Sequence, residues 1–155
     1  MVLAAGHAAP DFTLSDQYGA EIVLSELLQD GPVVLVFVPF AFSRICTMEF
    51  GELSGHLSLF EECSVRLLGV TVDSEWTLRA WSDQDRFDFP ILSDFWPHGD
   101  VARAYDAFIE RTGAAARATV VIAQDGRIAA SFVSDPGEAR SLEAYREALS
   151  ALAVQ

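Results

Sequence analysis

The chain has little of several features on which whole classes of protein depend. Two cysteines in 155 residues are too few for a disulfide framework. The apolar run over residues 33–38 is bounded by Gly31-Pro32 and Pro39 and falls short of the roughly 18 residues that a membrane-spanning helix needs. The N-terminus lacks a basic segment followed by an apolar one. We therefore expect a protein without a secretion signal, located in the reducing cytoplasm.

Basic residues are also scarce. The chain has 10 of them against 23 acidic residues, which gives a net charge of −13. Binding to nucleic acid or to an anionic membrane needs a concentrated positive face, so this balance argues against both. The acidic residues are scattered through turns and helix surfaces, as is typical of a solvated surface. In so acidic a chain, an arginine in an apolar context is a candidate functional residue.

Repeats, low-complexity tracts and linkers are missing as well, and we expect one domain over residues 1–155. That length is enough to bury a core without disulfides or metals. The three histidines, His7, His56 and His98, are widely spaced and have no ligand partner three or four residues away. The sequence therefore predicts no metal site.

Hydrophobic patterns predict an α/β fold. Strands are expected over residues 33–38, 65–72 and 89–93, with hairpins over 11–14 with 21–24 and 117–123 with 127–133. Helices are expected over 26–29 with Ser25 as cap, from Cys46 to about 62, over 75–84 with Ser74 as cap, over 100–108, and over 141–152. The central strand–helix–strand order favours parallel pairing, whereas the late hairpin adds antiparallel strands. This order fits a thioredoxin-like fold, a mixed central β-sheet flanked by helices, with an N-terminal β-hairpin.

The segment Pro39-x-x-x-Ser43-x-x-Cys46 joins the strand over 33–38 to the helix after it. Unpaired N–H groups and the positive end of the dipole at a helix start favour a thiolate over a thiol, and a thiolate is a nucleophile. The Ser43 hydroxyl can both donate and accept a hydrogen bond, and it can also serve as the helix cap. Pro39 has no N–H to donate, and its ring would cover the pocket. The alternative for Cys46 is a buried structural thiol.

These residues resemble the peroxiredoxin signature, in which proline, threonine or serine, and cysteine stand at these spacings. The likeness extends to residues 9–14 and to Cys46-Thr-x-Glu49. Residues 93–99 and Pro136-Gly-Glu138 resemble the one-cysteine alkyl hydroperoxide reductase E type of actinobacteria. The resemblance implies a thiol-dependent peroxidase that reduces hydrogen peroxide, organic hydroperoxides or peroxynitrite without metal, flavin or haem. Serine at position 43, where threonine is more usual, drops a methyl group and keeps the hydroxyl.

The resemblance also implies roles for residues outside the motif. The family places an arginine that pairs with the thiolate at the start of the late strand, which matches Arg117. In the family the position of Glu49 orients that arginine, so Glu49 is given a supporting role. Cys46 would attack the peroxide and become a sulfenic acid, which an external thiol resets through a mixed disulfide. Excess peroxide would carry Cys46 to sulfinic acid. Without the resemblance, Arg117 could equally be a surface residue in an ion pair.

The second cysteine, Cys63, matches none of the resolving positions associated with the family. A mostly helical segment rising 1.5 Å per residue would place it about 25 Å from Cys46, too far for a disulfide. We interpret it as a bystander, although local unfolding or an intersubunit bridge could overturn that. The resemblance then implies an external reductant, either a low-molecular-weight thiol such as mycothiol or a redoxin such as mycoredoxin or thioredoxin. It also implies a homodimer or higher homo-oligomer paired near the active-site loop.

Three other functions stay open. A thiol–disulfide oxidoreductase on the same fold is disfavoured because the chain has no Cys-x-x-Cys pair. A peroxide-sensing redox switch would oxidise once at Cys46 and then bind a partner. A non-catalytic interaction domain would react only sluggishly with peroxide.

Overall fold

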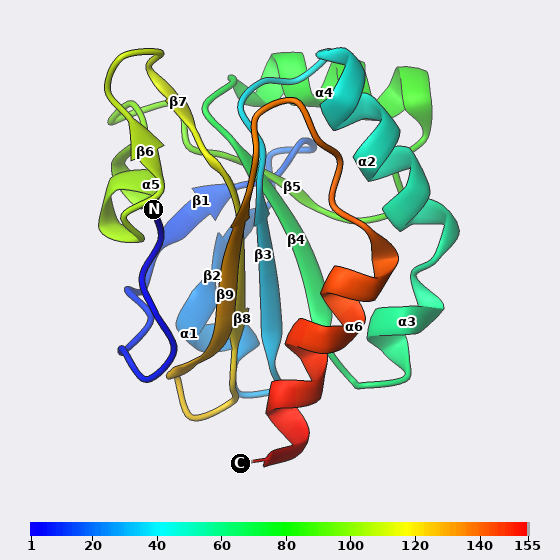
Figure 1. Cartoon of the computed structure of the whole chain (residues 1–155). Coiled ribbons are helices and arrows are strands. Elements are labelled where there is room, and N and C mark those ends of the chain that lie inside the picture. Colours follow the sequence, from blue (N-terminus) through cyan, green and yellow to red (C-terminus); the bar gives the residue numbers. More distant parts are fainter. Residues whose placement is uncertain (155) are drawn as a thin grey trace.

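The computed structural model describes residues 1–154 and is built around a seven-stranded mixed sheet (Figure 1). Its strands lie in the order β2 (Glu21–Val23), β1 (Thr13–Ser15), β5 (Ile91–Ser93), β4 (Arg66–Thr71), β3 (Val33–Phe37), β8 (Arg117–Ile122) and β9 (Ile128–Ser134). β4 pairs in parallel with β3 and β5, whereas β8 pairs antiparallel with β3 and β9. The thioredoxin-like fold and the N-terminal hairpin predicted from the sequence are confirmed.

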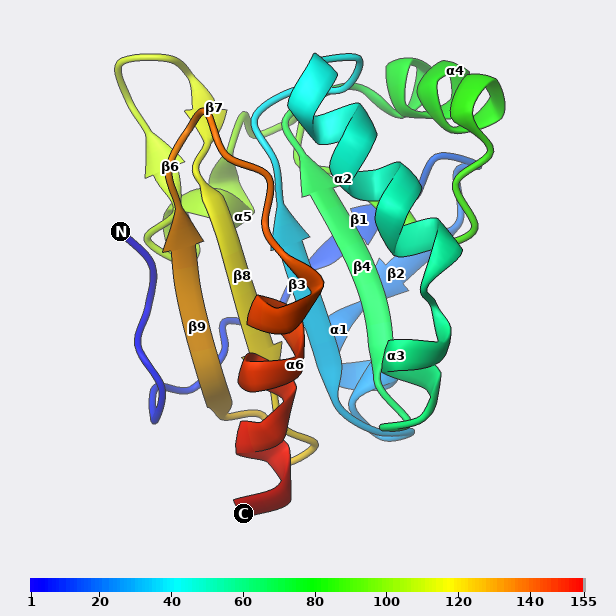
Figure 2. The same ribbon diagram turned by 45° about the vertical axis from the view of Figure 1, so that its right-hand side comes forward.

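Helices cover both faces of the sheet (Figure 2). Side chains alternate across β3, so Val33, Leu35 and Phe37 join one hydrophobic cluster while Val34 and Val36 join the other. The first cluster includes residues of α1 (Leu24–Leu27) and α5 (Asp100–Ala104), and the second includes residues of α2 (Arg44–Gly55), α3 (Ser58–Glu61), α4 (Glu75–Asp85) and α6 (Leu142–Ser150). A 3₁₀ turn (Ala151–Val154) follows α6. None of the helices within residues 1–154 combines the length and hydropathy needed to cross a bilayer.

The close approach of α2 to the sheet depends on a glycine in β4. A Cβ added at Gly69 would lie 2.7 Å from two ring carbons of Phe50, so only glycine leaves room for that ring. Phe50 also stacks on Trp81 of α4, with 5.1 Å between ring centroids. The indole N–H of Trp81 donates to the hydroxyl of Thr47 over 3.0 Å. These contacts fix the first turns of α2 at the carboxyl end of β3.

The limits predicted for two helices, the one over 26–29 and the one from Cys46 to about 62, are wrong. Val23 is the N-cap of α1, and Ser25 lies inside the helix, where its N–H donates to Asp11 Oδ1 over 2.9 Å. The helix predicted from Cys46 to about residue 62 is broken into α2 and α3. His56 ends α2 with φ −130° and ψ 33°, values outside the helical range. By contrast, Ser74 caps α4 as predicted.

The helix predicted over residues 100–108 is also shorter than expected. α5 ends at Ala104, and Asp106 adopts a left-handed conformation with φ 56°. The chain then forms a small separate hairpin of β6 (Phe108–Ile109) and β7 (Ala114–Ala115). Strands of two residues are too short to produce an alternating pattern, so the sequence did not predict them.

Candidate active site

Cys46 lies in the first turn of α2, directly after the segment that follows β3. Its side chain has 0% exposed surface. The first N–H groups of a helix have no acceptor within the helix, and Cys46 contributes one of them. In Figures 1 and 2 the loop from β9 to α6 arches over the same end of the sheet as this segment. The buried sulfur of Cys46 therefore belongs to the helix start at the carboxyl end of β3, the end over which this loop passes.

The sulfur of Cys46 is in direct contact with Arg117. Arg117 is the first residue of β8 and only 4% exposed, and its Nη2 donates to Cys46 Sγ over 3.3 Å. Its Nε donates to the carbonyl oxygen of Pro136 over 3.1 Å, which holds the guanidinium plane against the β9–α6 loop. A buried, permanently charged guanidinium therefore donates a hydrogen bond to the sulfur of Cys46.

Glu49 is shared between Arg117 and a second arginine, Arg140. Its Oε1 pairs with Nη1 of Arg117, and its Oε2 accepts from Nε and from the backbone N–H of Arg140 over 2.9 and 2.6 Å. Glu49 itself is only 3% exposed. Two buried guanidiniums thus face one carboxylate, and a thiolate at Cys46 brings the charge of the cluster to zero. Since a buried charge without a counter-charge is costly, the two guanidiniums depend on the anionic groups that face them.

Arg140 is the residue of this cluster that the sequence analysis missed. Its remaining N–H groups donate to the carbonyl oxygens of Phe37 and Ala118 over 2.9 and 3.0 Å, and to Thr119 Oγ1 over 3.0 Å. It therefore ties the ends of β3 and β8 to Glu49 of α2. The available signal was an arginine beside Ala139, just after the Pro136-Gly-Glu138 segment, in a chain with few basic residues.

Ser43 is the N-cap of α2, but its side chain does not cap the helix. Its Oγ is buried and has no hydrogen-bond partner within residues 1–154. A buried hydroxyl without a partner is costly, so the atom is available to a ligand at the sulfur. The residues before Ser43 are only partly covered: Pro39 is partly buried and Phe42 is 46% exposed. Phe42 also has a left-handed backbone conformation, with a φ of 66°.

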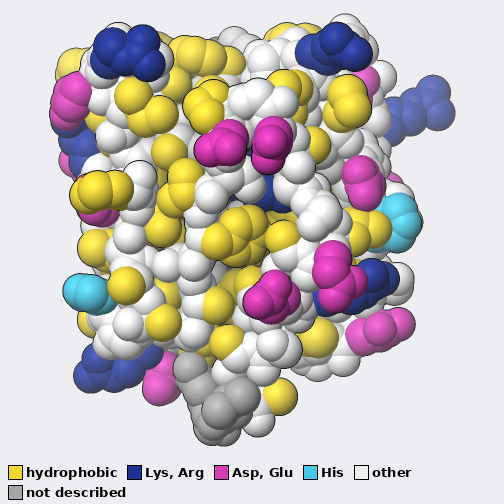
Figure 3. Space-filling view, in the orientation of Figure 1, with side chains coloured by type: hydrophobic (Ala, Val, Ile, Leu, Met, Phe, Trp, Pro, Cys, Tyr) yellow, Lys and Arg dark blue, Asp and Glu magenta, His cyan; other side chains and the backbone are white. Residues whose placement is uncertain are grey.

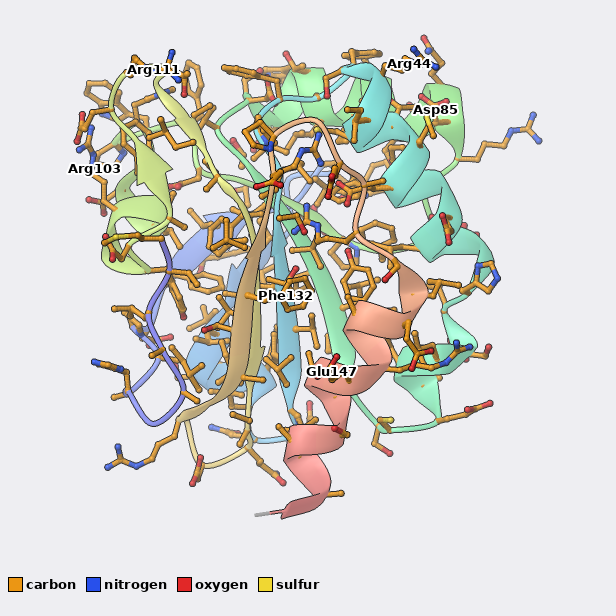
Figure 4. The ribbon with its side chains drawn as sticks, in the orientation of Figure 1. Arg44, Asp85, Arg103, Arg111, Phe132 and Glu147 are labelled. Atoms are coloured by element: carbon orange, nitrogen blue, oxygen red, sulfur yellow. The ribbon has the colours of Figure 1, made fainter. Side chains whose placement is uncertain are left out.

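The structure brings together four of the five predicted site residues through contacts or chain proximity: Cys46, Arg117, Glu49 and Ser43. Pro39, the fifth, lies just beyond the end of β3 and is partly buried. Arg44, the first residue of α2, is exposed and points into solvent (Figure 4). Its charge is thus held in water, unlike the charges of Arg117 and Arg140.

The other residues singled out in the sequence lie away from this site or outside its chemistry. Cys63 is exposed in the turn between α3 and β4. Within residues 1–154 no three His, Cys, Asp or Glu side chains lie together in a way that could hold a metal ion. A ring nitrogen of His7, His56 and His98 lies within hydrogen-bond distance of a backbone carbonyl in each case. Acidic side chains are spread over the face in Figure 3 rather than gathered in one patch.

Comparisons with known proteins agree with this geometry. Residues 5–131 match the model of the AhpC/TSA family. The chain is 41% identical over 151 residues to the alkyl hydroperoxide reductase E of Mycobacterium tuberculosis, covering 97% of this chain and 99% of that protein. It is 33% identical to the chloroplastic 2-cysteine peroxiredoxin of Chattonella marina var. antiqua, covering 98% of this chain and 82% of the relative.

Solved structures show the same likeness. The crystal structure of peroxidoxin BcpB from Mycobacterium tuberculosis superposes with a TM-score of 0.85 at 31% identity, over 98% of this chain and 97% of that one. The crystal structure of Enterococcus faecalis AhpC gives a TM-score of 0.88 at 25% identity, over 99% of this chain and 94% of that one. The similarity therefore extends over nearly the whole chain and includes the elements that carry the site.

Proposed function

Because this chain belongs to the AhpC/TSA family of peroxiredoxins and is a thiol-dependent peroxidase, we propose that Cys46 is its peroxide-reducing residue. The ionised sulfur attacks one oxygen of the peroxide along the O–O axis, and that oxygen stays on sulfur as a sulfenic acid. The other oxygen leaves with the bonding electron pair as hydroxide or alkoxide and takes up a proton to give water or an alcohol. The contact between Arg117 Nη2 and the buried Cys46 Sγ, at 3.3 Å, carries the proposal.

Donors around the sulfur suit the charge that moves during this step. Negative charge passes from Cys46 to the departing oxygen, so hydrogen-bond donors aimed at both positions lower the barrier. Arg117 and the free N–H groups of the first turn of α2 are such donors. The hydroxyl of Ser43, which has no partner within residues 1–154, can accept a hydrogen bond from the peroxide O–H and donate one to the departing oxygen. Pro39 would limit access of water to this space, since its ring is apolar and it has no N–H.

Glu49 and Arg140 act as positioning residues in this proposal. Glu49 holds Arg117 by its Oε1 and is itself held by Arg140 through two hydrogen bonds to its Oε2. Both charged groups are almost fully buried, so they do not reorient freely in water. The guanidinium of Arg117 is thereby fixed against the sulfur before a peroxide arrives, which avoids reorganisation during the reaction.

Membership of the family implies a peroxide substrate, a thiol reductant and oligomerisation. We infer further that hydrogen peroxide, organic hydroperoxides and peroxynitrite are reduced, and that the reductant is mycothiol or a redoxin such as mycoredoxin or thioredoxin. The chain would work as a homodimer or larger homo-oligomer in the cytoplasm, where thiols are kept reduced. Cys63 takes no part, because its exposed position after α3 belongs to another region of the fold than the enclosed sulfur of Cys46.

Stopped-flow tryptophan fluorescence tests the proposal. Trp81 reports on the site because its indole N–H donates to Thr47, the residue after Cys46. We expect a rapid peroxide-dependent change in the wild type, none in Cys46→Ser, and an unchanged response in the matched control Cys63→Ser. Peroxide-dependent signals in Cys46→Ser would remove Cys46 from the reaction.

Repeated additions of peroxide and thiol separate turnover from a single switching event. Each addition of thiol should restore the starting fluorescence and permit another cycle of oxidation. A redox switch instead predicts one oxidation followed by stable binding of a partner. Lost turnover in Cys63→Ser would show that the second cysteine resolves the sulfenic acid.

A further inference from the structure

The segment between β3 and α2 has an anchor that none of the residues discussed above supplies. The backbone N–H of Ala41 donates to Oδ2 of Asp73 over 2.7 Å. Asp73 lies just beyond the end of β4, and Ser74 after it caps α4. The bond therefore connects the loop that carries Pro39 and Ser43 to the neighbouring strand, 32 residues further along the chain.

Asp73 is itself held at both of its backbone groups. Its N–H donates to Oγ1 of Thr71, a buried residue at the end of β4, over 3.0 Å. Its carbonyl oxygen accepts from the hydroxyl of Ser93, at the end of β5, over 2.6 Å. β4 and β5 pair in parallel at this point, with Thr71 opposite Ser93. The backbone of Asp73 is thus fixed at the carboxyl ends of β4 and β5, and its carboxylate projects from this point.

The loop needs such an anchor because it contains a strained residue. Phe42, next to Ala41, has a φ of 66°, and a left-handed conformation costs a residue with a side chain about 1–2 kcal/mol. Its ring is 46% exposed and lies 6.3 Å from the ring of Trp81, so packing holds it only in part. If the bond to Ala41 were lost, the backbone could relax toward an unstrained conformation and carry Ser43 with it.

We propose that Asp73 is a positioning residue of the peroxidase site, acting through Ala41 on the turn that presents Ser43. The inference rests on the function proposed above, in which Ser43 and the first N–H groups of α2 hold the peroxide. Arg117 does not depend on this loop, since Glu49 and the carbonyl of Pro136 hold it. Asp73 therefore governs how the peroxide is held, and the pairing of Arg117 with the sulfur is independent of it.

Two reactions of the Cys46 sulfur distinguish an effect on peroxide binding from an effect on the pairing of Arg117 with the sulfur. In a Cys63→Ser background, leaving one thiol, the rate of oxidation by hydrogen peroxide is measured beside the rate of alkylation by iodoacetamide. Alkylation needs the thiolate but not the peroxide cradle. For Asp73→Ala we expect oxidation to slow by about 10- to 100-fold, the scale of a misplacement near 1 Å. Alkylation should stay within about 3-fold, because the pair formed by Arg117 and Cys46 is intact.

Asp73→Asn is the conservative variant and should restore most of the oxidation rate. Its amide oxygen can still accept from the N–H of Ala41, and only the charge is removed. The matched control is Asp83→Ala, which removes an exposed carboxylate from α4 and should leave both rates unchanged. Ser93→Ala removes the hydrogen bond to the carbonyl of Asp73 and should slow oxidation by a smaller factor, about 3-fold, with alkylation unchanged.

Four results would overturn the inference: wild-type oxidation in Asp73→Ala, equal losses in Asp73→Ala and Asp73→Asn, parallel losses of oxidation and alkylation, or wild-type oxidation in Ser93→Ala. If thermal unfolding shows that Asp73→Ala does not fold, Asp73→Asn and Ser93→Ala decide by the same criteria. If the Cys63→Ser parent itself does not react with peroxide at Cys46, the proposed function fails, which is a separate result.

Discussion

The helices α2 and α4 begin in almost the same way and use their first serine differently. Ser43 has φ −66° and ψ 148°, and Ser74 has φ −67° and ψ 158°. Ser74 accepts a hydrogen bond from the N–H of Thr77, whereas the buried hydroxyl of Ser43 has no partner within residues 1–154. A serine cap contributes about 1 kcal/mol to a helix. The start of α2 thus forgoes a stabilising bond that its backbone allows, and keeps polar groups available to a ligand.

The charged side chains of the two helices also differ, in how far they are exposed to solvent. α4 carries an exposed pair, Arg79 with Asp83, at 4.0 Å, and such pairs contribute little to stability. α2 carries Glu49, which is buried between Arg117 and Arg140. Charge at α4 is therefore solvated, whereas charge at α2 is enclosed and depends on its partners. The start of α4 thus contributes to stability, whereas the start of α2 keeps its polar groups available for the proposed reaction.

Removing Glu49 should have the largest effect. Glu49→Ala leaves two buried guanidiniums without their carboxylate, and breaking a buried pair in this way costs about 3–5 kcal/mol. Chemical denaturation of this variant beside Asp83→Ala measures the contrast, and the exposed-pair variant should lose less than about 1 kcal/mol. Equal losses in the two variants would contradict the distinction between enclosed and solvated charge.

Ser43→Ala should affect the reaction and spare the fold. Removing a donor to the departing oxygen is expected to slow oxidation of Cys46 by about 100- to 1000-fold. The free energy of unfolding should stay the same or rise slightly, because the lost hydroxyl has no partner among residues 1–154. Stopped-flow kinetics and denaturation of the same sample give both quantities. A destabilised variant with a normal rate would mean that Ser43 is an ordinary cap.

Ser74→Ala should show the reverse behaviour. It removes the hydrogen bond from the N–H of Thr77, so we expect a loss of about 1 kcal/mol in the free energy of unfolding. The oxidation rate should remain within about 2-fold of the wild type, since the neighbouring carboxylate of Asp73 is kept. A large kinetic effect without loss of stability would abolish the contrast between the two serines.

The smallest expected effect concerns the hydroxyl of Tyr145 on α6, which is also buried and has no partner in the part of the chain that the structure describes. Burial raises the pKa of Tyr145 to about 12 from its ordinary value of 10.0, partly offset by the charge of Arg140. The unfolded chain therefore loses this proton at lower pH than the folded protein does, and the stability associated with it declines as pH rises from 10 toward 12. Relative to Tyr145→Phe, the wild type should lose about 0.4 kcal/mol at pH 10. Denaturation of both proteins at neutral pH and at pH 10 measures this, and a constant difference would show that Tyr145 is not shifted.

How far the sequence predicts this molecule depends on the distance between the residues involved. β3 is apolar on both faces and bounded by prolines, and it was predicted with a boundary error of one residue. The two-residue strands β6 and β7 carry no such pattern and were missed. Local contrast in hydrophobicity therefore decides which elements can be read directly from the sequence.

The same holds for the site. Pro39, Ser43 and Cys46 stand in one segment, so their spacing alone indicates a site. Arg117 and Glu49 were assigned by family resemblance, and the structure places Arg117 against the sulfur and Glu49 against Arg117. Their roles stay predictions until variants are measured. The assignment of residues 1–155 to a single domain also stays a prediction.

Arg140 and Asp73 were missed for a different reason. Arg140 reaches Glu49 across 91 residues, and Asp73 reaches Ala41 across 32. Single arginines and aspartates have no periodicity of their own, and these contacts exist only once β3, β4 and β8 are paired. Supporting residues that act through tertiary contacts are therefore the part of a site that local patterns leave unidentified.

On the proposed mechanism, the net charge around the Cys46 sulfur changes during each cycle, because the one carboxylate of Glu49 is shared between two arginines. Once the departing oxygen has taken the negative charge from the sulfur, the carboxylate of Glu49 is the one anion that faces the guanidiniums of Arg117 and Arg140. The resulting net positive charge beside Cys46 favours binding of another anion. A reductant that arrives as a thiolate is such an anion. The reduction of oxidised Cys46 should therefore become faster as the pH is raised through the pKa of the reductant's thiol.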